Sequence, residues 1–118
     1  MANVRERLEG SIGIIELAGR LTVNDHPGLL KEAVAKVVDQ GARHVLVDLS
    51  GVPYIDSTRL GELIAAHVTI SRQGGRLKLT GAPRRIVDLL VLAGLADVFE
   101  RFDSLEAATR ALGDASSA

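Results

Sequence analysis

The feature that most constrains the fold is a short apolar run from Val45 to Leu49, in which Asp48 is the one polar residue. A run of this length and composition is typical of a β-strand that is covered on both faces, rather than of one strand of an exposed hairpin. Such a strand needs helices on both sides of its sheet. The chain is therefore predicted to be an α/β protein.

Turn signals divide the rest of the chain into strands and helices. Strands are predicted at residues 4–8 and 12–17, which form an opening hairpin, and then at 45–49, 77–79 and close to 98–102. A helix is predicted after the second strand and after each later one. Asn24 or Asp25 caps the first helix in this prediction, and Asp103 or Ser104 caps the last. The order β-β-α-β-α-β-α-β-α has connections short enough for one layered α/β structure.

Length and composition exclude several classes of protein. The chain has 118 residues, no cysteine and a net charge of −1 from 14 basic and 15 acidic residues. It is long enough to bury a core without disulfides, and the even spread of charge predicts no direct nucleic-acid binding. No apolar run approaches the roughly 20 residues that span a bilayer, so no membrane insertion is expected. We expect a single cytoplasmic domain over residues 1–118, with a frayed tail from Gly113.

The segment after the central strand is the candidate site. Gly51 and Pro53 interrupt the strand, and Asp56, Ser57 and Thr58 supply side-chain oxygens where a new helix begins. The structural interpretation is that these residues cap the helix, which is their commonest role in such a position. The functional interpretation is a phosphate on Ser57, because a helix N-terminus accommodates the added charge.

The residues of the chain do not suggest an enzyme. His26, His44 and His67 fall in three unrelated segments without metal-ligand spacing, and no GxxxxGK[ST] or GxGxxG loop is present to hold a nucleotide. Ser57 does not lie in a GxSxG motif, and no histidine is placed as its base. We therefore expect no catalytic residue, no metal and no cofactor. Arg84 and Arg85 begin a predicted helix, where the dipole disfavours cations.

The segment VLVDLSGVPYIDSTRLGEL resembles the signature of the STAS domain, the family of bacterial anti-sigma factor antagonists. The likeness extends to Gly19-Arg20-Leu21, to GGRLKLTG, to LLVLAGLADVFERF and to the closing SLEAATRAL helix. It covers nearly the whole chain in the order of the family's elements. The resemblance implies the STAS fold, a mixed β-sheet of four to five strands with about four α-helices packed against it.

The resemblance also implies a mechanism. In family members of the sporulation and general-stress type, the unmodified antagonist binds an anti-sigma factor that is also a serine kinase, and this frees the sigma factor. Phosphorylation of the serine after the aspartate breaks that complex, and a phosphatase restores it. Ser57 matches that serine, Asp56 matches the aspartate, and Thr58 is the reserve phosphoacceptor. The predicted partner surface comprises Thr22, Asn24, Asp25, Tyr54, Asp56, Ser57, Thr58 and Arg59.

Two positions depart from the family pattern. Arg59 stands where phosphorylated members usually have glycine, and it is expected to project near Ser57, where it would pair with a phosphate or block a kinase. Thr22 stands where many members have an acidic residue. Two alternatives therefore stay open: a scaffold that assembles with other STAS proteins in a stress-signalling complex, and a regulatory subunit of an ABC-type lipid transporter.

Overall fold

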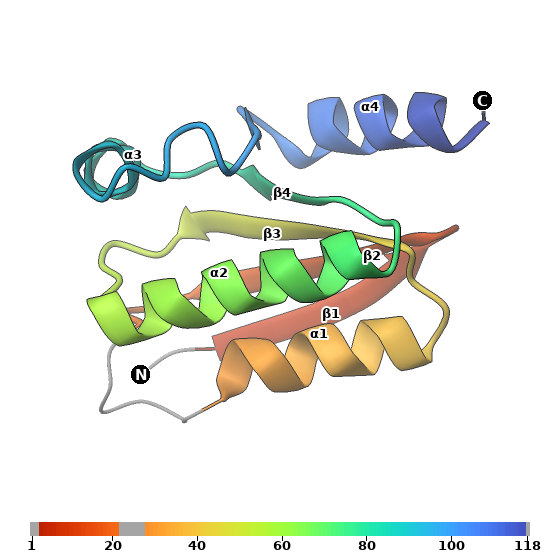
Figure 1. Ribbon diagram of the computed structural model, residues 1–118, viewed down its shortest axis with the longest axis horizontal. Coiled ribbons are helices and arrows are strands. Elements are labelled where there is room, and N and C mark those ends of the chain that lie inside the picture. Colours follow the sequence, from red (N-terminus) through yellow and green to blue (C-terminus); the bar gives the residue numbers. More distant parts are fainter. Residues whose placement is uncertain (1–2, 22–27, 118) are drawn as a thin grey trace.

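The computed structural model describes residues 3–21 and 28–117, and in this part of the chain five strands form one sheet with four helices around it (Figure 1). The strands are β1 (Asn3–Glu9), β2 (Ile12–Ala18), β3 (His44–Gly51), β4 (Leu77–Thr80) and β5 (Arg101–Phe102). The helices are α1 (Leu29–Asp39), α2 (Ser57–Arg72), α3 (Arg84–Leu92) and α4 (Leu105–Ser117). The predicted order of strands and helices and the predicted fold class are confirmed.

The strands lie in the sheet in their order along the chain. β1 pairs antiparallel with β2, whereas β2, β3, β4 and β5 are parallel to one another. β1 is therefore an edge strand. The side chains of Arg5, Arg7 and Glu9 on this strand are exposed, and Arg7 pairs with Glu16 of β2.

Helices cover both faces of the sheet, as the apolar run in β3 predicted. Val45, Val47 and Leu49 lie in the main core together with residues of α1 and α2. Leu46 points to the opposite face, into a smaller cluster that includes Leu112 of α4. Figure 1 shows α1 and α2 on one side of the sheet and α4 on the other. Each fully buried aliphatic side chain contributes about 1.5–3 kcal/mol to folding, so β3 anchors both halves of the core.

The start of α1 and the burial of α3 differ from the sequence prediction. α1 begins at Leu29 with Gly28 at its N-cap position, a glycine with a φ of 78°, while Asn24 and Asp25 lie outside the described residues. α4 extends from Leu105 through Ser117, and the one glycine that it contains is tolerated in a helix at a cost of about 1 kcal/mol. α3 is less buried than its apolar sequence suggested, since Ile86 and Leu90 are its buried residues.

Across residues 3–21 and 28–117, none of the helices combines the length and the apolar character needed to cross a membrane.

Candidate functional site

The loop between β3 and α2 is held in place by the segment that follows β2. The backbone N–H of Leu21 donates to the carbonyl oxygen of Tyr54 at 2.8 Å, and the N–H of Asp56 donates to the carbonyl oxygen of Leu21 at 2.9 Å. Leu21 and Ile55 form an isolated parallel bridge through these bonds. The start of α2 is thus fixed to the β2 end of the sheet by main-chain hydrogen bonds that do not depend on side-chain identity.

Asp56 caps α2, and Ser57 is the first residue of the helix. The Oδ1 atom of Asp56 accepts a hydrogen bond from the N–H of Arg59 at 2.9 Å, and its carbonyl oxygen accepts one from Leu60, also at 2.9 Å. Ser57 and Thr58 are exposed, and the first turn of α2 carries no acidic residue. The positive end of the α2 dipole therefore lies beside two exposed residues that carry hydroxyl groups.

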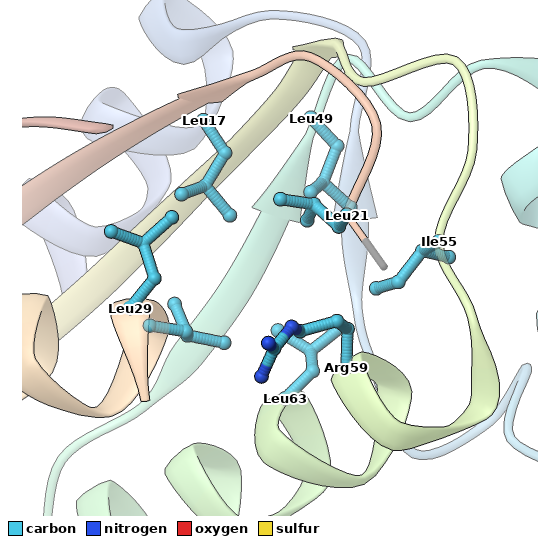
Figure 2. Close-up of a pocket in the computed structure, with 8 residues that line it drawn as sticks. Leu17, Leu21, Leu29, Leu49, Ile55, Arg59 and Leu63 are labelled. Carbon is cyan, nitrogen blue, oxygen red and sulfur yellow. The ribbon is translucent and has the colours of Figure 1, made fainter. Parts of the chain in front are cut away.

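Arg59 does not project from the site as the sequence suggested, because its side chain is directed into the protein (Figure 2). The residue is 5% exposed. Its guanidinium pairs with the carboxylate of Glu62, one turn further along the helix. The surrounding pocket is lined by the aliphatic residues Leu17, Leu21, Leu29, Leu30, Leu49, Ile55 and Leu63.

The burial of Arg59 has a simple geometric reason. Arg59 lies four residues before Leu63, so the two side chains share one face of α2, and that face packs against the core. Glu62 supplies the opposite charge that a buried guanidinium requires. The outer face of the first turn consequently carries Ser57 and Thr58 without the bulk of Arg59 beside them.

A groove separates the start of α2 from α3. Its lining residues are Tyr54, Ile55, Asp56, Ser57, Leu60, Arg84, Arg85, Ile86, Asp88, Leu89, Leu92 and Ala93. Leu60, Ile86 and Leu89 form an apolar floor, and Leu92 is 86% exposed at the far end. Ser57 therefore stands at the edge of an apolar groove rather than on a flat surface.

Apart from the buried Arg59, the predicted partner residues either lie at the groove or fall outside the described residues. Tyr54, Asp56 and Ser57 line the groove together, and Thr58 is exposed beside them. The ring of Tyr54 also receives the guanidinium of Arg20, 4.8 Å from the ring centre, in a cation–π contact. Thr22, Asn24 and Asp25 lie outside the described residues, directly after Leu21.

Sequence reasoning did not place Arg20 or Leu92 near Ser57. A contact such as that of Arg20 with Tyr54 has no local signal, because the two residues are far apart along the chain. For Leu92 a signal exists: residues 89–92 are all apolar, and one face of a nine-residue helix cannot bury four consecutive side chains.

None of the described residues that line the groove is a histidine. His67 lies ten residues beyond Ser57 on the same helix, about 15 Å along its axis, and packs edge-on against Phe99 with ring centres 5.4 Å apart. Among the described residues, no group of three or more His, Cys, Asp or Glu side chains could hold a metal ion. Exposed hydroxyls beside an apolar groove are instead suited to contact with another protein.

Comparison with known proteins identifies the family. The family model for the STAS domain matches residues 3–108 of the chain. The chain belongs to the STAS domain family. The match begins with β1 and ends within α4, so it includes the loop after β3, the start of α2 and the whole of α3.

Relatives of this STAS domain carry one recurring description. This chain is 33% identical over 86 residues to the anti-sigma-B factor antagonist of Bacillus subtilis, and the match covers 73% of this chain and 77% of the relative. A putative anti-sigma factor antagonist from Thermotoga maritima matches in structure with a TM-score of 0.81 at 22% identity, over 91% of this chain and 92% of its own. The phosphorylated form of the Bacillus cell-fate determinant SpoIIAA has a TM-score of 0.70 at 16% identity, over 92% and 99% of the two chains. The two structural matches support the fold alone.

Proposed function

We propose that this STAS domain is an anti-sigma factor antagonist whose binding is switched by phosphorylation of Ser57. In its unmodified form it binds a kinase-type anti-sigma factor in the cytoplasm and so releases a sigma factor. The partner kinase phosphorylates Ser57, the complex dissociates, and a phosphatase restores the active form. Thr58 is the reserve acceptor. The domain acts in this scheme as a binding protein and a kinase substrate, not as an enzyme.

One observation carries the proposal: Ser57 is an exposed residue at the N-terminus of α2 and lines a groove that also has apolar walls. A kinase can reach such a hydroxyl, and a partner in the groove would lie against it. The phosphorylated form named for SpoIIAA, a member of the same fold, agrees with a modified state in this family.

The chemistry of the helix start explains how the switch works without refolding. A phosphate adds a charge of about −1.5 to −2, which the N-terminus of α2 and its dipole accommodate. The same charge opposes any partner carboxylate that approaches the groove. A hundredfold loss of affinity needs about 2.8 kcal/mol, which like-charge contact in an interface can supply.

A titration of the chain with a kinase-type anti-sigma factor from the same organism tests the proposal. We expect tight binding by the wild type and at least about a tenfold weaker affinity for Ser57→Asp, because an acid at this position mimics part of the phosphate charge. With ATP, intact-mass and peptide mapping should place phosphate on Ser57 and find none on the chain with Ser57→Ala.

The matched control is Ser104→Asp at the N-cap of α4, where the serine Oγ accepts the N–H of Ala107 at 3.1 Å. It adds the same charge at a helix start away from the groove, so it should leave the affinity unchanged. Equal binding by the wild type and Ser57→Asp, or phosphate on another residue alone, would overturn the switch.

A further inference from the structure

α3 presents cations and apolar side chains on the side that faces Ser57. Arg84 and Arg85 form its first turn and line the groove, and the side chain of Arg84 is 92% exposed. At the other end of the helix, Leu92 lines the groove and is 86% exposed. An exposed leucine of this degree beside other apolar groove residues is a mark of a binding surface.

The placement of the two arginines is unfavourable for the isolated protein. A helix N-terminus carries about half a positive charge, so a cation placed there lowers the stability of the helix. α3 has Pro83 at its N-cap, no side-chain capping bond and no acidic residue in its first turn. Asp88 lies 4.0 Å from Arg84, but it is 62% exposed and belongs to the next turn.

The start of α2 forms the other wall of the groove. Ser57 is exposed there, and the carboxylate of Asp56 is engaged as the cap of α2 through the N–H of Arg59. Two arginines at the N-terminus of α3 therefore border an apolar groove, and they favour an anionic group at this end. The geometry points to a partner that is apolar along the groove and acidic at the end near Ser57.

We propose that this groove docks an amphipathic helix of the anti-sigma factor, with leucine-like residues against Leu60, Leu89 and Leu92 and carboxylates against Arg84 and Arg85. The helix α3 is nine residues long, about 12 Å from first to last residue, so it matches two to three turns of a partner helix. A second copy of this chain fits less well, because it would bring the same arginines and helix N-termini to the contact. The inference rests on the proposed function and gives its partner a chemical character.

Charge removal in the unmodified protein provides the test, because it leaves Ser57 intact. We expect Arg84→Gln with Arg85→Gln to weaken binding to the anti-sigma factor about tenfold to a hundredfold at low salt, and to flatten the salt dependence of the affinity. The control pair is Arg72→Gln with Arg110→Gln, two exposed arginines at the end of α2 and on α4. It removes the same charge away from the groove and should change the affinity less than twofold.

Leu92→Ala probes the apolar end. It should weaken binding about tenfold, whereas Val68→Ala, which removes an exposed apolar side chain elsewhere on α2, should not. If the wild type binds and Ser57→Asp weakens that binding, but the arginine variant binds as tightly as its control, the groove inference is wrong and the proposed function stands.

A peptide experiment decides the inference even if no anti-sigma factor binds. Two designed helical peptides of 12 residues share the same leucines and differ in carrying glutamates or lysines at the remaining exposed positions. We expect the glutamate peptide to shift the backbone NMR signals of residues 84–93 and 57–60, and the lysine peptide not to. Equal shifts from both peptides, no shift from either, or a concentration-dependent dimer abolished by Leu92→Ala would overturn the acidic-partner inference.

Discussion

At the scale of single residues, Asp56 and Ser57 differ in their role at the start of α2, although the sequence alone presents both as candidate caps. Asp56 closes the first turn of α2 through the N–H of Arg59, whereas Ser57 is an exposed helical residue. The stability of the helix start therefore depends on Asp56, and the hydroxyl of Ser57 is not needed as its cap. We therefore expect the proposed modification of Ser57 to act on binding with little effect on the fold.

The division predicts different costs for two alanine variants. Asp56→Ala should lower the free energy of unfolding by about 1 kcal/mol or more, because the cap is lost, while Ser57→Ala should change it by a few tenths of a kcal/mol. Urea unfolding followed by circular dichroism measures both. A larger loss for Ser57→Ala than for Asp56→Ala would mean that the serine hydroxyl, and not the aspartate, supports the helix start.

At the scale of the elements, two glycines differ in the space that their surroundings leave for a side chain. Gly13 of β2 lies under Val37 of α1: a Cβ at Gly13 would come within 2.7 Å of the Val37 side chain and 3.1 Å of the Ala42 Cβ. Gly61 of α2 is the opposite case, since a Cβ there would meet no atom within 4 Å. A methyl group at Gly13 would therefore clash with α1, whereas a methyl group at Gly61 would fit without a clash.

Alanine at each glycine should change stability in opposite directions. Gly13→Ala should cost about 1–3 kcal/mol, because α1 must move away from β2. Gly61→Ala should add about 0.5–1 kcal/mol, because alanine is the better helix former. Denaturant midpoints of the two variants against the wild type give the comparison, and a Gly13→Ala protein as stable as the wild type would contradict the close approach of α1 and β2.

At the scale of the whole molecule, a buried histidine lies at the end of the sheet opposite the site. His44, at the start of β3, is 5% exposed, and its Nδ1 accepts the backbone N–H of Arg76 at 3.1 Å. Burial lowers the pKa of His44 below its ordinary value of 6.5, and the charges of Arg43, Arg76 and Lys78 lower it further. Protonation would occupy the lone pair that holds the N–H of Arg76.

The lowered pKa of His44 determines the sign of its contribution to the pH dependence of the free energy of unfolding. The unfolded chain takes up the proton first, at about pH 6.5, so the contribution of His44 is complete above that pH and is lost as the pH falls through the lower folded pKa. We expect the wild type to lose more stability than His44→Asn between pH 7.5 and 5.5, because asparagine keeps an acceptor for Arg76 without titrating. Parallel losses in the two proteins, measured by urea unfolding, would remove His44 as the cause.

Much of this architecture was predictable from local patterns. The apolar run in β3 required cover on both faces, and the glycines and caps that punctuate the chain gave the order of elements. Arg59 was misjudged because a charged residue was assumed to be outside, although its spacing to Leu63 placed it on the inner face of α2. The groove itself depends on how α3 lies against α2, and no local pattern encodes that relation between distant segments.

The charged side chains on the edge strand β1 affect how the protein associates at high concentration. A strand at the edge of a sheet has unpaired backbone groups, and at high protein concentration other chains can add to it. Exposed charged side chains stand at alternate positions along β1, at Arg5, Arg7 and Glu9. Any second sheet that approached β1 would have to desolvate these side chains, which disfavours edge-to-edge association of concentrated copies.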